Sequence, residues 1–570
     1  MKRFLTYMKG NRLGAILGPL LKLCEAALEL IVPLVIANII DVGIKDKDGW
    51  YIVKSCAVLL LLGAVGFAFS VIAQYFCARC AVGSVTKMRF SLFSHLQTLS
   101  YTEIDKIGTA TMITRMSADA NQVQTGVNLA LRLLLRSPFV VFGAMIMAAI
   151  VAPTSAMPFG ITIAVLSVIV FGIMLTTMPM YKATQKKLDG VVLKTRENLS
   201  GARVIRAFCK EDDEISEFKD KNGALSKMQI IVGRVSTLMN PMTFAVINAG
   251  IIVLLYTGAI DVKDGNLSAG EVVALYNYMS QILIELIKLA NLIITITKAL
   301  ASLSRINSVF DIQSSMPNGT VTEGKQDACV LAFKGAALKY YGAAEESISG
   351  LNFSINKGET LGIIGGTGSG KTSLINLIPR FYDATEGEVC FNGVNVKDYD
   401  LTYLRSKIGI VPQKSVLFAG TIRDNMKICN ENADDDAIYR ALKIAQADQF
   451  VIEKGGLDAI VEQGGKNLSG GQRQRLAIAR AIVKAPELLI LDDSASALDY
   501  ATDAALRASL KSLDNTTTII VSQRASSIMH ADKIIVLDDG EPETIGTHGE
   551  LLKSSIVYRE IYSTQFEEVV

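Results

Sequence analysis

The chain has 570 residues, half of which are hydrophobic, and its mean hydropathy is positive. This length exceeds that of one domain, and the hydropathy lies above the usual range of soluble proteins, so a membrane protein is expected. A net charge of only +2 argues against nucleic acid as a partner, because nucleic-acid-binding proteins carry a concentrated basic surface.

Three long stretches, 55–78, 137–181 and 235–260, contain no charged residue. A helical span needs about 20 apolar residues, so the second stretch accommodates two spans. Pro153 and Pro158 place a turn at 152–158, since two prolines cannot both lie inside a helix. The sequence therefore predicts four membrane spans, at about 55–78, 132–152, 158–181 and 235–260.

Two further apolar segments, 13–40 and 270–296, are interrupted by the ionisable residues Lys22, Glu25, Glu29, Glu285 and Lys288. Each such group costs on the order of 2–3 kcal/mol or more inside a bilayer unless it faces a wet cavity or a partner. We expect both segments to be membrane helices that face the bundle interior, with Glu285 and Lys288 near enough to pair. The charged groups either form the polar walls of a translocation cavity or lie near the membrane interface, and the sequence leaves both interpretations open.

Basic residues are concentrated in 2–12, 79–115 and 182–234, whereas the loops between these regions are short and acidic or neutral. Because basic segments favour the cytoplasmic side, the N-terminus and the chain after the sixth span are predicted to lie in the cytoplasm, beneath an inner or plasma membrane. The connections between spans two and three and between spans four and five are long and helix-prone. We expect them to extend the spans into the cytoplasm, with tips near 102–119 and 207–218.

The amino-acid composition changes after the predicted transmembrane domain. Positions 311–328 lose apolar periodicity and contain Pro317, Asn318 and Gly319, which is typical of a linker. Beyond it, short Val/Ile/Leu runs alternate with helical patterns, as in a soluble α/β domain. The sequence therefore predicts a transmembrane domain over 1–310, a linker over 311–328 and an α/β domain over 329–570.

The α/β domain contains the pattern G-x-x-x-x-G-K-[ST] between an apolar strand and a helical segment. Its members are Gly365, Gly366, Thr367, Gly368, Ser369, Gly370, Lys371 and Thr372, and Ser373 follows them. Backbone N–H groups of such a loop bind phosphate oxygens, Lys371 reaches the β- and γ-phosphates, and Thr372 ligates Mg²⁺. The loop predicts a bound nucleoside triphosphate.

Two patterns follow the glycine loop. The apolar run 488–492 ends in Asp492, which suits a carboxylate that holds Mg²⁺. A highly specific segment lies between the two and consists of Leu468, Ser469, Gly470, Gly471 and Gln472.

With these motifs in this order, essentially the whole chain resembles the ATP-binding cassette (ABC) transporters in their exporter-type arrangement. The resemblance implies an all-α transmembrane domain of six helices followed by an α/β P-loop NTPase domain that binds ATP. It also implies that Tyr340 stacks on adenine, with Tyr341 as the competing aromatic residue. Gln413 matches the glutamine that contacts Mg²⁺ and senses the membrane domain, 468–472 is the signature motif, and Asp499 closes the D-loop, 496–499.

In this family two cassettes face each other head to tail, so each ATP lies between the glycine loop of one cassette and the signature motif of the other. The chain has one cassette and six predicted spans. The resemblance therefore implies half of a transporter that needs a second half as its partner.

Two catalytic positions depart from the family pattern. The glutamate that usually follows the Mg²⁺-binding aspartate is Asp493, whose shorter side chain withdraws the carboxylate by roughly 1–1.5 Å, a shift that can cost on the order of 10²-fold in rate. The switch histidine is replaced by Gln523, which donates a hydrogen bond but does not titrate as imidazole does. The sequence therefore predicts a site that binds ATP well and hydrolyses it slowly, with Asp493, Gln523 and Gln413 as its catalytic residues.

The intact binding motifs and altered catalytic positions resemble the degenerate-site half of heterodimeric bacterial multidrug or lipid exporters. The resemblance implies a small-molecule, lipid or peptide substrate. One alternative is a homodimeric exporter or lipid flippase with two slow sites, and another is a soluble-type ABC ATPase.

Overall fold

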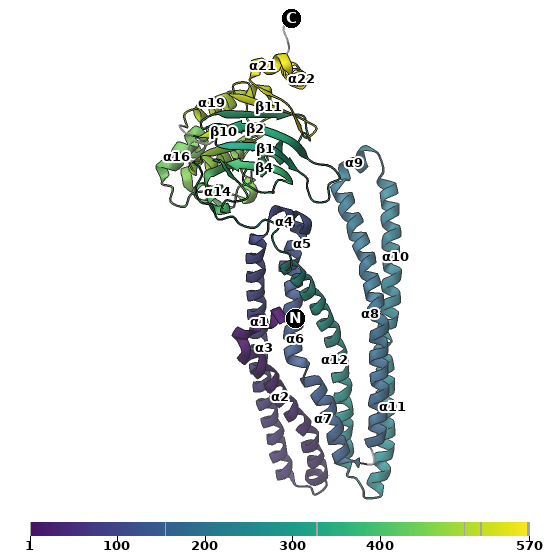
Figure 1. The fold of residues 1–570 in the computed structure, drawn as a ribbon. Coiled ribbons are helices and arrows are strands. Elements are labelled where there is room, and N and C mark those ends of the chain that lie inside the picture. Colours follow the sequence, from purple (N-terminus) through teal and green to yellow (C-terminus); the bar gives the residue numbers. More distant parts are fainter. Residues whose placement is uncertain (1, 154–155, 326–328, 495, 514–515, 567–570) are drawn as a thin grey trace. The chain divides into compact units, whose positions relative to one another are not determined.

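The computed structural model describes residues 2–153, 156–325, 329–494, 496–513 and 516–566. Contacts divide the chain into two compact units (Figure 1), of which unit 1 comprises 1–97 and 110–312 and unit 2 comprises 98–109 and 313–570. Positions 154 and 155 of the predicted turn and 326–328 of the predicted linker lie outside the described residues.

Unit 1 is helical. Its helices are α1 (Lys2–Met8), α2 (Arg12–Asn38), the π-helix η2 (Ile39–Ile44), α3 (Gly49–Thr98), α5 (Thr109–Thr114), the π-helix η3 (Arg115–Asp119), α6 (Ala120–Leu133), α7 (Arg136–Val151), α8 (Ala156–Ser200), α9 (Ala202–Ala207), α10 (Glu211–Thr237), α11 (Met239–Lys263) and α12 (Ala269–Phe310). Within the described part of the chain they form six runs long and apolar enough to cross a membrane, namely Arg3–Ile44, Gly49–Thr98, Thr109–Val151, Phe159–Ser200, Glu211–Lys263 and Ala269–Phe310. The expectation of six long apolar helices is confirmed.

Helices α12 and α8 make most of the packing contacts of unit 1. Helix α12 packs against α2, α6, α7 and α11, and α8 packs mainly against α10 and α11. The six runs continue well beyond the predicted spans: α3 extends to Thr98, and α8 and α10 form a long pair joined through α9. The exact limits of the spans remain predictions.

A buried ionic network joins three of these helices. Arg136, at the start of α7, donates from Nη1 to Glu285 Oε1 on α12 and from Nη2 to Glu29 Oε2 on α2, each at 2.6 Å. Glu285 also accepts from Ser137 Oγ at 2.7 Å and from Lys288 Nζ at 2.8 Å. The predicted Glu285–Lys288 pair is confirmed, and the side chains of Arg136 and Glu285 are only 8% and 4% exposed.

A second polar contact joins α2 to α3. Lys22 Nζ donates to Glu25 Oε2 at 2.5 Å and to Ser70 Oγ at 2.8 Å. Each ionisable residue of the two interrupted segments therefore has a partner: Lys22–Glu25 and Glu285–Lys288 lie within one helix. Glu29 and Glu285 also bond Arg136 on a neighbouring helix. Such pairing lowers the cost of placing these groups in a membrane helix.

The described residues of unit 2 form three β-sheets. Its strands are β1 (Leu331–Leu338), β2 (Ile348–Ile355), β3 (Thr360–Gly365), β4 (Glu386–Phe391), β5 (Val394–Asn395), β6 (Ile408–Val411), β7 (Gly420–Thr421), β8 (Ile460–Val461), β9 (Leu488–Asp492), β10 (Thr517–Val521), β11 (Lys533–Asp538) and β12 (Glu541–Gly546). One sheet has the order β12-β11-β3-β10-β9-β6, a second is antiparallel with the order β2-β1-β4-β5, and β7 pairs with β8. In the six-stranded sheet only β12 is antiparallel to its neighbour, so the predicted α/β domain is confirmed.

The helices of unit 2 are α4 (Tyr101–Ile107), α13 (Lys371–Leu377), α14 (Leu401–Lys407), α15 (Ile422–Lys427), α16 (Asp435–Ile444), α17 (Asp448–Glu453), α18 (Gly470–Val483), α19 (Tyr500–Leu510), α20 (Ala525–Ile528), α21 (His548–Ser554) and α22 (Ile556–Gln565). Strand β9 is buried along its whole length, as expected of a central parallel strand covered on both faces. The carboxyl ends of parallel strands meet at one edge of a sheet. The loops after β3, β6, β9 and β10, which hold most of the predicted site residues, are therefore neighbours.

Helix α4 lies within the first predicted extension, yet its contacts belong to unit 2. Tyr382 donates its hydroxyl proton to Asp105 at 2.6 Å, and the rings of Tyr101 and Phe381 lie 4.8 Å apart. The sequence grouped this segment with the transmembrane domain over 1–310. The structure differs because these aromatic and polar contacts attach α4 to the loop that follows α13.

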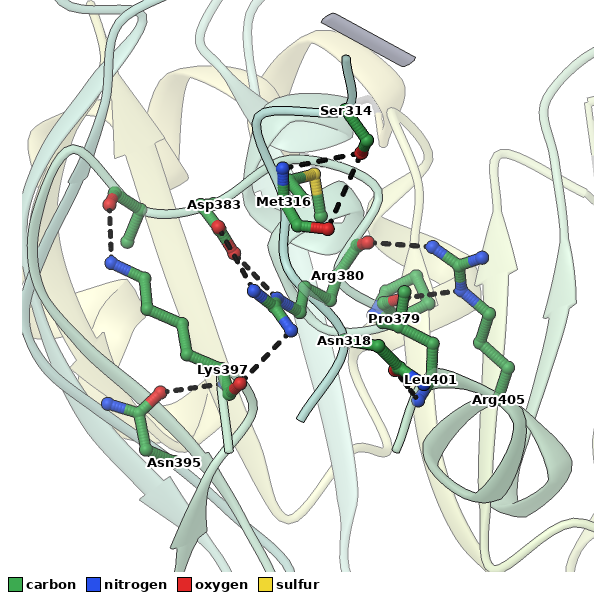
Figure 2. Close-up of polar contacts among 11 residues, drawn as sticks. Ser314, Met316, Asn318, Pro379, Arg380, Asp383, Asn395, Lys397, Leu401 and Arg405 are labelled. Atoms are coloured by element: carbon green, nitrogen blue, oxygen red, sulfur yellow. Dashed lines mark hydrogen bonds and ion pairs between the residues drawn. The ribbon is translucent and has the colours of Figure 1, made fainter. Parts of the chain in front are cut away.

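That loop is itself held by a buried arginine (Figure 2). Arg380 is 1% exposed, and its guanidinium donates to both carboxylate oxygens of Asp383, at 2.7 and 3.2 Å, and to the carbonyl of Lys397 at 3.0 Å. Arg405 donates two more hydrogen bonds to the backbone of the same loop. These contacts fix the loop and therefore the position of Tyr382, which lies between Arg380 and Asp383 in the sequence.

The ionic network generates a stability prediction. Arg136→Gln leaves Glu285 buried without its guanidinium partner, and breaking a buried pair in this way costs about 3–5 kcal/mol. We expect the thermal unfolding midpoint of the detergent-solubilised chain to fall by roughly 5 °C or more, measured by differential scanning fluorimetry.

The matched control is Lys288→Gln, because Lys288 bonds the same carboxylate but is 44% exposed. Its loss should cost at most about 1 kcal/mol. The double variant Arg136→Gln, Glu285→Gln should recover part of the lost stability, since it leaves no buried charge at this pair. Equal effects of Arg136→Gln and Lys288→Gln would contradict the assigned role of Arg136.

Candidate functional site

The glycine loop connects β3 to α13 and requires glycine at particular positions. Gly368 and Gly370 have φ values of +88° and +87°, a conformation that L-residues with a side chain rarely adopt. A Cβ atom on Gly370 would also lie 2.4 Å from Cγ2 of Ile348 and 2.6 Å from the carbonyl oxygen of Ser347. The loop therefore curls tightly before α13 begins at Lys371.

Lys371 places its charge over this loop. Its Nζ donates to the carbonyls of Gly365 at 2.9 Å and Gly366 at 2.5 Å. Burial lowers the pKa of Lys371, an effect that the nearby carboxylates of Asp493 and Asp492 partly offset. A partly buried cation beside the backbone N–H groups at a helix start is suited to binding phosphate.

Thr372 and Asp492 bring oxygen ligands together although they are far apart in the chain. Thr372 Oγ1 donates to Asp492 Oδ2 at 3.2 Å. Burial raises the pKa of Asp492, while the hydrogen bond from Thr372 acts in the opposite direction. A hydroxyl and a carboxylate side by side form the all-oxygen donor set that Mg²⁺ prefers, so these residues fit the predicted ion.

A cavity of about 340 Å³ lies over the glycine loop. It is lined by Thr367, Gly368, Ser369, Gly370, Lys371, Thr372 and Ser373, by Gln413 and Gln523, and by Glu346, Ser347, Asp539 and Gly540. The structure thus brings the glycine loop, Gln413 after β6 and Gln523 after β10 into one pocket.

Asp493 lies beside this pocket with an unusual backbone. Its φ is +45°, which is uncommon for a residue other than glycine, and its N–H donates to the carbonyl of Val521 at 2.9 Å. Its carboxylate accepts a hydrogen bond of 3.4 Å from Gln413 Nε2. Two residues predicted to be catalytic, Asp493 and Gln413, are therefore in contact.

The two adjacent tyrosines occupy different surroundings. The hydroxyl of Tyr340 donates to Ser373 Oγ at 3.1 Å, and its ring meets that of Tyr382 edge to face at 5.0 Å. Tyr341 is 75% exposed, and the ammonium of Lys106 lies 4.1 Å from its ring centroid. Tyr340, rather than Tyr341, contacts the helix that carries the glycine loop.

The signature motif lies in a separate pocket of about 440 Å³. This pocket is lined by Ser469, Gly470, Gly471, Arg475, Ala497, Leu498 and Asp499, so the signature and the D-loop are brought together. Among the described residues, none lines both this pocket and the phosphate pocket. Leu468 is buried, and Gln472 forms a capping box with Ser469 at the start of α18, so both side chains shape the motif itself.

Sequence reasoning missed Gln474, which connects two of the loops. This side chain is 3% exposed, donates to the carbonyl of Asp493 and accepts from the N–H of Ala497, both at 3.2 Å. Helical spacing places Gln474 on the same face as the buried Ala477 and Ile478, and a polar residue on an apolar face was the signal that could have identified it.

The family model for the ABC transporter transmembrane region matches residues 15–286, and the ABC transporter model matches residues 348–496. The chain is 33% identical over 568 residues to the uncharacterized ABC transporter ATP-binding protein YfiB of Bacillus subtilis (strain 168), covering 99% of each chain. It is 29% identical over 603 residues to the putative multidrug export ATP-binding/permease protein YgaD of the same organism, again covering 99% of each.

The fold is also that of a solved structure, a bacterial Atm1-family ABC exporter with ATP bound. The TM-score is 0.80, the sequence identity 22%, and the match covers 99% of each chain. The match of the membrane region and the six candidate spans rule out a soluble-type ABC ATPase and identify a multi-pass membrane protein.

The ATPase domain implies ATP binding, and the full-length match shows that this domain and the membrane region belong to one chain. ABC exporters function as dimers, and the chain carries one copy of each region. The chain therefore belongs to the ABC transporter family, as an ATP-hydrolysing half-transporter with the exporter fold.

Proposed function

We propose that this chain is one half of a heterodimeric exporter of the cell membrane. It binds MgATP at a degenerate site of its own and supplies its signature motif to the competent site of a non-identical half. The N-terminus and the ATPase domain face the cytoplasm, and closure of the two ATPase domains drives the membrane helices from an inward-facing to an outward-facing arrangement. The cargo is a small molecule, a lipid or a peptide, and the similarity to the putative multidrug export protein YgaD supports export.

The separation of the two pockets supports a composite site. The phosphate pocket contains Lys371 and Thr372 but no signature residue, and the signature pocket contains Ser469 but no phosphate-binding lysine. In this family the glycine loop and the signature motif of one ATP site come from two different halves. Each pocket of this chain is therefore completed by a second half. The signature pocket then serves the ATP that is held by the partner's glycine loop.

The observation that carries the proposal is the pairing of an intact binding loop with two altered catalytic positions. The Asp493 carboxylate is engaged by Gln413, and it is one methylene shorter than the glutamate expected at this position. Gln523 lines the phosphate pocket, where its amide can donate to a γ-phosphate but cannot accept a proton from it. Binding is therefore retained while activation of water is weakened.

Mg²⁺ would be held by Thr372 and Asp492, with Gln413 as the third predicted ligand. When bound, it would neutralise negative charge that develops on the phosphates. Thr372 and Asp492 would orient the nucleotide, and Lys371 would hold the phosphate oxygens from the other side. None of these residues is altered in this chain, which agrees with a site that retains nucleotide binding.

The degenerate site predicts a gain of function. The test uses the complex purified through a tag on this chain, with Ser469→Arg added to silence the competent site. In that background, restoring both catalytic groups with Asp493→Glu and Gln523→His should raise the remaining ATP turnover at least tenfold, because the longer carboxylate reaches the attacking water. Phosphate release by the complex in liposomes measures the rate.

Asp436→Glu is the matched control, since it makes the same chemical change on the exposed face of α16. It should leave turnover unchanged. If the double variant hydrolyses ATP no faster than the parent, the degenerate site is refuted.

The composite site predicts unequal roles for the two pockets. In the complex purified from native membranes through a tag on this chain, Ser469→Arg should lower ATP turnover by roughly 10²-fold, because it blocks the signature side of the competent site. Lys371→Met should lower turnover by less than about tenfold, since it acts at the slow site.

Mass spectrometry of the same complex identifies the second half. The proposal requires a non-identical ABC half-transporter, whereas a complex that contains only this chain would favour the homodimeric alternative. A larger loss with Lys371→Met than with Ser469→Arg would reverse the assigned site roles.

A further inference from the structure

We propose that Gln565, the last residue of α22, is a positioning residue for the switch segment, defined here as residues 522–525. Its side-chain amide fixes the backbone on both sides of Arg524 and thereby holds Gln523 in the phosphate pocket. This inference rests on the proposed function in one respect, namely that Gln523 contacts the γ-phosphate.

The Gln565 amide makes two hydrogen bonds to the switch segment. Its Nε2 donates to the carbonyl of Gln523 at 2.7 Å, and its Oε1 accepts from the N–H of Ala525 at 2.8 Å. Donor and acceptor of one rigid, planar group thus bind the residues on either side of Arg524. A backbone segment held at two points in this way has little freedom to rotate.

The bond to Ala525 also satisfies a helix terminus. Helix α20 begins at Ala525, and its N-cap residue, Arg524, provides no capping side chain. The first N–H groups of a helix have no partner inside the helix, and Ala525 is fully buried from solvent. Gln565 supplies the acceptor that this N–H would otherwise lack.

Helix α22 is a firm support for this contact. Tyr558 on α22 is fully buried and belongs to an apolar cluster with Ile364, the residue that precedes the glycine loop, and with Ile528 of α20. At the other end of the helix, the N–H of Tyr558 donates to Ser555 Oγ at 3.0 Å. The position of Gln565 is thus set by packing against the elements that carry the loop and the switch segment.

The switch segment extends toward the D-loop as well. Arg524 donates from Nη1 to the carbonyl of Leu498 and from Nη2 to the carbonyl of Ser496, each at 3.2 Å. Leu498 lines the signature pocket, and Gln523 lines the phosphate pocket. Gln565 fixes the backbone that carries the side chains of Gln523 and Arg524. It thereby sets the position of the switch segment relative to both pockets.

The test measures discrimination between ATP and ADP by the full-length chain in detergent. Gln565→Met removes both hydrogen bonds and preserves the length of the side chain. We expect the Kd for MgATP to rise about five- to tenfold and the Kd for MgADP to change less than about twofold, because only ATP carries the γ-phosphate that Gln523 contacts. A merely structural role of α22 would weaken both nucleotides equally, and that result would overturn the proposal.

A second pair of variants shows whether Gln565 acts through Gln523. In a Gln523→Ala background, Gln565→Met should cause no further loss of ATP affinity, and a full additional loss would overturn the inference. If Gln565→Met does not fold, Gln565→Glu takes its place, since it keeps the acceptor for Ala525 but cannot donate to the Gln523 carbonyl. Gln565→Glu should then reproduce the selective loss of ATP affinity.

Thr564→Ala is the control on the same helix, because the Thr564 hydroxyl bonds the carbonyl of Ile561 within α22. It should leave both Kd values unchanged, and an equal effect would overturn the proposal. The proposal would also be overturned if the unmutated chain bound MgATP and MgADP with equal affinity. These binding measurements are independent of turnover, so they distinguish failure of this inference from failure of the degenerate-site proposal.

Discussion

The parallel register of four strands is the constraint on which the ATP site depends. Val521 of β10 is paired with Asp492 of β9, and Leu491 of β9 with Val411 of β6, so these strands end level with one another. Strand β10 pairs on its other side with β3, which leads into the glycine loop. A slip of one residue would turn every side chain of a strand to the opposite face and would separate the loops that hold the phosphates.

On the proposed function, the same fold explains why this chain alone does not complete an ATP site. The phosphate pocket lies at the carboxyl ends of the parallel strands, whereas the signature pocket is formed by the start of α18 together with the D-loop before α19. Gln474 and Arg524 connect the two pockets through the backbone of the D-loop. On the proposed function, this connection would couple one composite site to the other, although the two ATP molecules would bind to different glycine loops.

Local patterns in the sequence predicted the fold class, the glycine loop and the signature motif, because glycines, apolar runs and fixed spacings act over a few residues. Contacts between distant residues could not be predicted in the same way. Arg136 was overlooked because it adjoins an uncharged stretch, and its partner Glu285 lies 149 positions away. Gln565 lies 42 positions from Gln523, in a helix with no motif, and only the packing of α22 reveals its role. The sequence indicated which residues could do chemistry, but not which residues hold them in place.

A chain that keeps its binding loop and alters its catalytic groups separates two properties that one residue set usually provides. On the proposed function, affinity for ATP would depend on the loop backbone, Lys371 and the oxygen ligands, whereas the hydrolytic step would depend on Asp493 and Gln523. Changes confined to the second set lower turnover without removing the binding free energy. On the proposed function, ATP at this site would therefore remain bound through several turnovers at the competent site and would hold the two ATPase domains together. The switch segment is bonded to Gln565 and to the D-loop through Arg524, and it would connect this retained nucleotide to the signature pocket, which on the proposed function completes the competent site.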